Sequence, residues 1–240
     1  MSTLVENVAK VTAAHAALAT AIAAKGVAVP ENTKLSDMPT LVDAIQTGGG
    51  TPEPNVSRAV FAGDDSTSIT VPAVMVVSTS GWTSLAYAFF NCSSLSSLTL
   101  PDGFGAAATD ATNCFSSCSS LSSLTLPDGF GALVTSTTQM FNNCGRLSVL
   151  HLPSGFGQSS TYNGFMFRWC GALETITGNP NFKASLDLSA CKKLTHDSLM
   201  VIINGLQTVT GATLTLGAEN LAKLTDEEKK VATDKGWTLA

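Results

Sequence analysis

The stretch FFNCSSLSSLTLPDGFG, residues 89–105, decides the fold, because it occurs again as FSSCSSLSSLTLPDGFG at residues 115–131. A third copy, FNNCGRLSVLHLPSGFG, covers residues 141–157, and a fourth starts at residue 167 and loses the pattern after Ile176. A fixed period of this length indicates a repeat architecture. Four columns keep a spacing of 26 residues: Phe89, Phe115, Phe141 and Phe167; Cys92, Cys118, Cys144 and Cys170; Leu95, Leu121, Leu147 and Leu173; and Leu98, Leu124, Leu150 and Ile176.

Each copy predicts a short strand followed by a tight return. Leu98 and Leu100 alternate with Thr99, as in a half-buried strand, and Pro101 and Gly103 end that strand. One coil cannot bury its own Phe, Cys and Leu side chains, whereas stacked coils turn each column into a continuous apolar row. We therefore expect an α/β repeat solenoid with 26-residue coils, whose strands form hydrogen bonds from coil to coil.

The six cysteines of the chain are interpreted as small buried side chains. Four of them share a repeat column, and Cys114 falls on the column that Ala88, Met140 and Met166 occupy in the other copies. A ladder of disulfides is the alternative in an oxidising compartment. We expect no zinc site, because the repeat cysteines lie a full coil apart and no histidine is at ligand spacing. No cofactor is expected either.

The composition limits the classes of partner. Charged residues make up 13% of the chain, below the roughly 25% of an ordinary soluble domain. The net charge of −5 argues against nucleic acid, which requires clustered Lys and Arg. No apolar run reaches the roughly 18 residues of a membrane helix, so no membrane insertion is expected. Glu6, Lys10 and His15 argue against a signal peptide, and we expect synthesis in the cytosol without export.

Residues 1–47 predict a helical module for attachment and oligomerisation. Gly26 and Pro30 end a first helix, a second one follows Ser36, and residues 48–56 are interpreted as a linker. A helical hairpin that packs on itself is one interpretation; self-association, with a homotrimer favoured, is the other. The second interpretation rests on apolar and polar positions at coiled-coil spacing: Leu4, Val8, Val11, His15, Leu18 and Ile22.

Residues 57–194 are assigned to the solenoid and residues 195–240 to a C-terminal helical cap. A helical stripe runs through Leu199, Ile202, Ile203 and Leu206, and Leu214 and Leu216 predict a last strand. Residues 225–228, TDEE, predict a helix start with an acidic first turn. Charged residues concentrate here, where the open end of a solenoid meets water.

The repeat unit resembles the BspA-like leucine-rich repeat, in which an F-x-x-C-x-x-L turn precedes a short strand and Pro. Residues 89–176 carry this pattern, and LDLSACKKL, residues 186–194, resembles a shortened further coil. The C-terminal segment is similar to the ending of repeat proteins encoded by phages and prophages of gut bacteria. The N-terminal helix with GVAVP and KLSDMPTLVDAI, residues 26–30 and 34–45, resembles the opening segment of phage fibre proteins.

These resemblances imply a structural or binding protein located in the virion, as a head or tail fibre or decoration protein. Its N-terminal helices would contact other virion proteins, and its solenoid would bind a host-surface protein or glycan. The alternative is a BspA-like adhesin, located at the bacterial cell surface or secreted, that binds host matrix or cells.

The motifs of common enzymes do not occur in this chain. His15, His151 and His196 fall in three different elements, and G-x-S-x-G, H-E-x-x-H and phosphate-loop patterns do not occur. We therefore expect no catalytic activity.

A candidate binding surface follows from the two positions before each repeat Cys. They hold Phe90-Asn91, Ser116-Ser117, Asn142-Asn143 and Arg168-Trp169 in successive copies. The last pair departs from small polar residues, and Trp and Arg are the usual anchors of recognition surfaces. Packing of Trp169 against the C-terminal cap or a neighbouring chain is the alternative. The candidate surface comprises Arg146, Tyr162, Arg168 and Trp169, together with His151 on the strand face.

Overall fold

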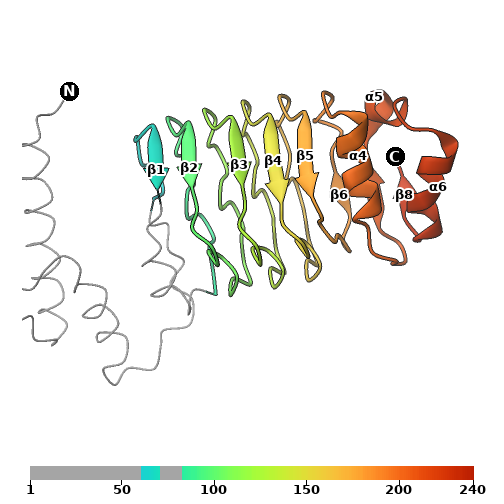
Figure 1. Ribbon diagram of the computed structural model, residues 1–240, viewed down its shortest axis with the longest axis horizontal. Coiled ribbons are helices and arrows are strands. Elements are labelled where there is room, and N and C mark those ends of the chain that lie inside the picture. The colour runs from blue at the N-terminus through green and yellow to red at the C-terminus, as the bar shows by residue number, and fades with distance from the viewer. Residues whose placement is uncertain (1–60, 71–82) are drawn as a thin grey trace, which may run out of the picture. The chain divides into compact units, whose positions relative to one another are not determined.

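Short parallel strands lie side by side along one axis in the computed structural model of the protein, which describes residues 61–70 and 83–240 (Figure 1). The chain divides into two units, residues 1–54 and 55–240, and the second one is described here. The predicted N-terminal helices, with Leu4, Val8, Val11, His15, Leu18 and Ile22, lie outside the described residues and stay predictions.

The predicted row of strands is present. It comprises β1 (Ser68–Thr70), β2 (Ser97–Thr99), β3 (Ser123–Thr125), β4 (Val149–Leu152) and β5 (Thr175–Gly178). β1 pairs with β2, and β3, β4 and β5 form a second sheet; all these pairings are parallel. Leu124 lies opposite Leu150, which lies opposite Ile176, so the 26-residue period of the sequence is the register of the sheet. This confirms stacked coils of the leucine-rich-repeat kind.

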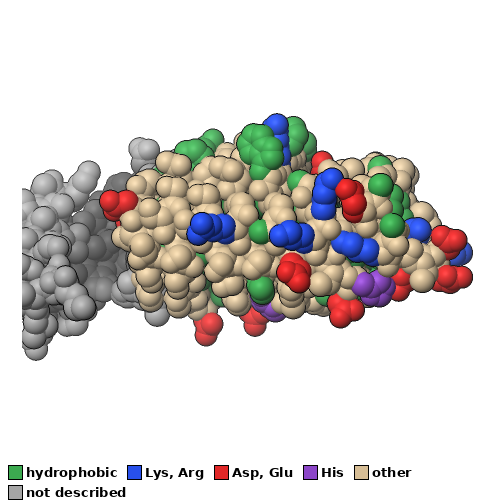
Figure 2. Space-filling model, turned by 90° about the horizontal axis from the view of Figure 1, so that it is seen from above, with side chains coloured by type: hydrophobic (Ala, Val, Ile, Leu, Met, Phe, Trp, Pro, Cys, Tyr) green, Lys and Arg blue, Asp and Glu red, His purple; other side chains and the backbone are tan. Residues whose placement is uncertain are grey.

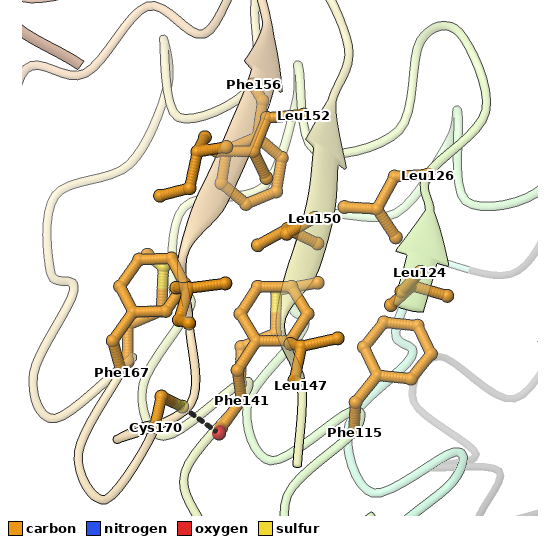
Figure 3. Packing of buried hydrophobic residues seen from close by; sticks show 14 of the residues in the cluster. Phe115, Leu124, Leu126, Phe141, Leu147, Leu150, Leu152, Phe156, Phe167 and Cys170 are labelled. Atoms are coloured by element: carbon orange, nitrogen blue, oxygen red, sulfur yellow. Dashed lines mark hydrogen bonds between the residues drawn. The ribbon is translucent and has the colours of Figure 1, made fainter. Parts of the chain in front are cut away.

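Aromatic stacking and thiol hydrogen bonds join the coils in the core. The rings of Phe115, Phe141 and Phe167 stack with centroids 5.4–5.7 Å apart, and Figure 3 shows them in a row beside Leu124 and Leu150. Such ring pairs each add about 0.5–1.5 kcal/mol beyond the burial of their area. All six cysteines are buried and free, which confirms their interpretation as core residues.

A second column of phenylalanines, to which the sequence analysis gave no role, fills the other half of each coil. Phe104, Phe130, Phe156 and Phe182 are spaced by 26 residues and are all buried. The glycine after each of the first three packs on the next ring: a Cβ on Gly131 would lie 2.5 Å from Phe156 Cδ2. Gly131 also has a φ of +78°, which glycine adopts without strain. The G-F-G of the repeat is thus a packing motif.

The C-terminal segment is helical, as predicted, and it also contains a sheet. The helices are α4 (His196–Asn204), α5 (Gly217–Leu221) and α6 (Asp226–Asp234). The strands β6 (Leu186–Asp187), β7 (Thr213–Thr215) and β8 (Thr238–Leu239) pair in parallel, and β8 was not predicted. Among residues 61–70 and 83–240, no helix has the length and apolar character to cross a membrane.

Helix α4 takes the place of the next strand after β5 (Figure 1). Ile176 N donates to Ser198 Oγ at 2.9 Å, and Ser198 Oγ donates to the carbonyl oxygen of Glu174 at 2.9 Å. One buried serine of α4 therefore satisfies backbone groups that a further strand would have paired. Thr195 caps α4, and a capping box of Thr225 and Glu228 begins α6 where the sequence predicted a helix start.

Candidate recognition surface

The turns that precede the repeat cysteines form a second ladder, which we call the turn edge: residues 87–91, 113–117, 139–143 and 165–169. Two positions of each turn, the first and the last, have a left-handed backbone, with φ between 54° and 65°. This conformation lets the backbone N–H point to the following coil: Ser117 N donates to Asn142 O at 2.8 Å, and Asn143 N donates to Arg168 O at 2.9 Å.

Left-handed backbone favours glycine and asparagine, and bulky side chains there are strained. The middle coils obey this preference, since Asn113, Ser117, Gln139 and Asn143 occupy the four left-handed positions. The two end coils depart from it: Tyr87 occupies one such position in the first coil with a φ of 62°, and Phe165 and Trp169 occupy both positions in the fourth coil with φ of 57° and 62°. Each such residue costs about 1–3 kcal/mol, and such outliers gather at functional sites.

Phe165, Arg168 and Trp169 form one exposed cluster. The Cζ atom of Arg168 lies 4.2 Å from the centroid of the Trp169 ring and 5.2 Å from that of Phe165. Phe165 is 53% exposed and Trp169 57% exposed, and Figure 2 shows hydrophobic side chains gathered around a basic one at the margin of a mostly polar surface. The two rings hold the guanidinium through cation–π attraction.

Tyr162 belongs to the same coil and is 57% exposed. Its ring lies against Gly164, because a Cβ on Gly164 would be 2.5 Å from Tyr162 Oη. The equivalent positions of Gly164 in earlier coils hold Ala86, Thr112 and Thr138. The tyrosine and the glycine that accommodates it are therefore both departures of the fourth coil from the repeat.

One buried amide beside the cluster lacks a partner. Asn142 is 9% exposed, and its Oδ1 accepts no hydrogen bond from any residue that the structure describes. An unpaired buried acceptor costs about 1–3 kcal/mol. Asn142 has the same place in the third coil that Arg168 has in the fourth. The next residue, Asn143, donates its backbone N–H to the carbonyl oxygen of Arg168 and so joins the two turns.

The structure brings some of the predicted binding residues together and places the others elsewhere. Arg168 and Trp169 are in contact, and Tyr162 shares their coil. Arg146 is exposed after Cys144, and no hydrogen bond or ion pair joins it to another described residue. His151 lies on β4, where its Nδ1 is 3.0 Å from Thr177 Oγ1. The assignment of these residues to a binding surface stays a prediction.

Phe165 was missed by the sequence analysis. The signal was available, because Phe165 shares a column with Tyr87, Asn113 and Gln139, and the residue type in this column changes from copy to copy, unlike that of the core columns. Packing of Trp169 against the cap is not observed, since more than half of its side chain is exposed among the described residues. A second, smaller aromatic pair lies on the first coil, where the rings of Tyr87 and Phe90 meet edge to face at 5.4 Å.

Within residues 61–70 and 83–240 no three His, Cys, Asp or Glu residues come together as a metal site would require. The thiols are not ligands or nucleophiles in this state. Burial raises the pKa of Cys170 to about 12 and that of Cys144 well above its usual range. Both therefore remain protonated at neutral pH.

Parallel strands, a core of repeated columns and an exposed turn edge define a leucine-rich-repeat solenoid. The family model of the BspA-type leucine-rich repeat region matches residues 55–195, in six copies. Because this match covers more than half of the chain, the protein belongs to the BspA-type leucine-rich repeat family. Proteins with such repeats are typically binding proteins without enzymatic activity.

No curated protein and no solved structure matches the chain. None of the comparisons supports the resemblance of the terminal segments to phage proteins, and the family match supports the adhesin interpretation better than the virion interpretation.

Proposed function

We propose that the protein is a non-enzymatic adhesin, displayed at a bacterial cell surface, that binds partners on other surfaces through the cluster of Tyr162, Phe165, Arg168 and Trp169. The observation that carries this proposal is the placement of Phe165 and Trp169 at left-handed backbone positions. Five of the eight left-handed positions hold Asn, Gln or Ser, and the other three hold the exposed aromatic residues Tyr87, Phe165 and Trp169, so folding alone does not select aromatic residues there.

The chemistry of the cluster fits recognition. Trp, Tyr and Arg are the side chains that most often dominate binding energies when they are displayed on a surface. The stacked arrangement limits the rotamers of Arg168, which reduces the entropy lost on binding. The parallel coils beneath the cluster supply a rigid support, since both sides of each coil are hydrogen-bonded to the next.

The test compares the full-length protein with a variant that restores the residue types of the repeat: Phe165→Gln, Arg168→Ser and Trp169→Asn. Fluorescently labelled protein is applied to a panel of epithelial and bacterial cells, and attachment is measured by flow cytometry. We expect the restored variant to lose at least tenfold in attachment, because its anchors are removed. Its melting temperature should stay equal or rise, since two strained positions are relieved.

A matched control changes exposed apolar residues elsewhere in the solenoid. Leu133→Ala and Val149→Ser alter side chains that are 50% and 43% exposed, and both also restore residue types of the repeat. This control should attach like the wild type. Unchanged attachment of the restored variant, or no attachment of the wild type to any cell in the panel, would overturn the proposal.

A further inference from the structure

The guanidinium of Arg168 is held in place but its hydrogen-bonding capacity is unused. The rings of Trp169 and Phe165 contact it, and no hydrogen bond or ion pair of Arg168 side-chain nitrogens occurs among the described residues. A guanidinium that is fixed by aromatic rings keeps its in-plane N–H donors available. These donors match the two oxygens of a carboxylate.

Between the first and the fourth coil, the exposed part of the turn edge is polar and neutral. On the middle coils Asn143 is exposed, and Ser117 and Gln139 are half-buried. A long contact of 3.4 Å joins Asn143 Nδ2 to Ser117 Oγ. An interface with a protein would require an apolar centre that excludes water. Amides and hydroxyls beside isolated aromatic rings instead suit a ligand with apolar C–H faces and many hydroxyl groups, which is a carbohydrate.

The geometry of the edge fits an extended ligand. Each coil advances the edge by the spacing of paired strands, about 4.8 Å, and the stacked phenylalanines beneath it are 5.2–5.7 Å apart from centroid to centroid. This step is close to the length of one pyranose unit in a linear chain. Aromatic side chains stand at both ends, with Phe165 and Trp169 on the fourth coil and Tyr87 and Phe90 on the first.

We infer that the turn edge binds an acidic oligosaccharide, a chain of pyranose units that carries carboxylate groups. A carboxylate accepts hydrogen bonds from the Arg168 guanidinium, and the C–H face of a neighbouring pyranose lies on the exposed ring of Trp169. The chain then follows the amides of Gln139 and Asn143 towards the first coil. This inference rests on the proposed function, because it names the ligand of the same cluster.

The experiment uses the full-length protein and three sets of probes. The first set contains oligomers of galacturonate, oligomers with alternating glucuronate, and sialylated oligosaccharides. The second set contains the methyl esters of the same compounds, which keep the sugar faces but lack the charge. The third is a polyglutamate peptide, which has carboxylates without sugars. Binding is measured by calorimetry, and by Trp fluorescence with Trp169→Asn as the blank, because that variant reports the signal of the other two tryptophans, Trp82 and Trp237.

We expect at least one acidic oligosaccharide to bind, with a loss of about tenfold or more on esterification, as charge-assisted hydrogen bonds are removed. Arg168→Gln should abolish the difference between acid and ester, whereas Trp169→Asn should weaken the binding of the ester as well as that of the acid. Val149→Ser on the strand face should change neither.

Three results would overturn the inference: no binding of any acidic oligosaccharide, equal binding of acid and ester by the wild type, or binding of polyglutamate as strong as that of the sugars. The last result would identify an acidic peptide as the ligand. If the restored variant loses cell attachment but the wild type binds none of these sugars, the proposed adhesin function stands and the proposal of an acidic oligosaccharide ligand is refuted. Unchanged cell attachment of that variant refutes the adhesin function itself.

Discussion

Each repeat cysteine donates its thiol hydrogen to a backbone carbonyl of the preceding coil. Cys118 Sγ lies 3.2 Å from Phe89 O, Cys144 Sγ 3.1 Å from Phe115 O, and Cys170 Sγ 3.0 Å from Phe141 O, the contact drawn in Figure 3. The column therefore uses both properties of cysteine, its small apolar volume and its weak donor. This explains why the repeat holds Cys there and not Ala.

The thiols should be almost unreactive in the native protein. Burial raises the pKa of Cys114, Cys144, Cys170 and Cys191, and the thiolate is the reactive form. We expect labelling with a maleimide at pH 8 to modify few thiols in the native protein, because all six are buried, and to modify all six after denaturation without reductant. Fewer than six thiols after denaturation would indicate disulfides and contradict this arrangement.

Gly131→Ala tests the packing role of the glycine after the second phenylalanine. The added Cβ would lie 2.5 Å from the Phe156 ring and take a φ of +78°. Overpacking and left-handed strain together should lower the free energy of unfolding by about 2–4 kcal/mol. Gly145→Ala is the matched control, because its Cβ would meet nothing within 4 Å. Urea unfolding measures both variants; equal stability of the two would show that the coils adjust freely.

The helices of the cap are joined by a titratable contact. His196 Nε2 of α4 lies 2.9 Å from Glu228 Oε1 of α6, and the other oxygen of Glu228 accepts from Thr225 N at 2.8 Å. One carboxylate thus closes the capping box of α6 and binds α4. Hydrogen bonds that His196 donates to Glu228 and then to Asp197 raise its pKa above the usual 6.5, and the hydrogen bond from the Thr225 N–H lowers the pKa of Glu228 below its usual 4.5.

This contact should make the stability of the cap depend on pH. The raised pKa of His196 means that its contribution is complete below about pH 6.5 and is lost as the pH rises through the higher folded value. The lowered pKa of Glu228 means that its contribution is present above about pH 4.5 and is lost as the pH falls through the lower folded value.

The melting temperature of the wild type should therefore exceed that of His196→Gln at pH 5.5 by more than at pH 8.5. His151→Gln is the control, since His151 contacts Thr177 and no carboxylate in the described structure. Calorimetric scans at both pH values measure the differences. A difference for His196→Gln that is the same at both pH values would show that the charge of His196 does not contribute.

The solenoid as a whole was predictable because its information is periodic. The columns of Phe, Cys and Leu predict the coil length, the strand row and the core, and TDEE at residues 225–228 predicts the start of α6. The two-residue strand β8 has no period and could not be predicted from its residues. That α4 replaces a strand depends on the hydrogen bonds of Ser198 with β5, which are set by tertiary packing.

The candidate site was predictable only in part, because part of its character depends on backbone conformation. Arg168 and Trp169 stand out against the repeat, but their strain depends on a left-handed backbone that the sequence does not display. Once that backbone is known, Phe165 becomes as conspicuous as Trp169, and the role of Gly164 beneath Tyr162 becomes clear. His151 stood out in the sequence by the same criterion, yet it lies on the strand face with Thr177 as its partner.

The division of the chain at residues 54 and 55 leads to a prediction for the whole molecule. The family match begins at residue 55, and the buried columns of the described structure all lie beyond it. A chain that begins at Asn55 should therefore fold by itself, because nearest-neighbour contacts between coils supply most of the stability of a solenoid. If residues 1–47 are the oligomerising module, as their coiled-coil spacing predicts, the shortened chain should be monomeric.

Circular dichroism and light scattering on the full-length and shortened chains measure folding and mass separately. A full-length variant with Leu4, Val11 and Leu18 changed to Ser is the matched control, because it keeps the whole chain but removes the apolar positions of the predicted coiled coil. It should have the mass of a monomer and an unchanged solenoid. A shortened chain that folds but remains an oligomer would place the self-association in the solenoid, because the predicted coiled coil would then be absent from the assembly.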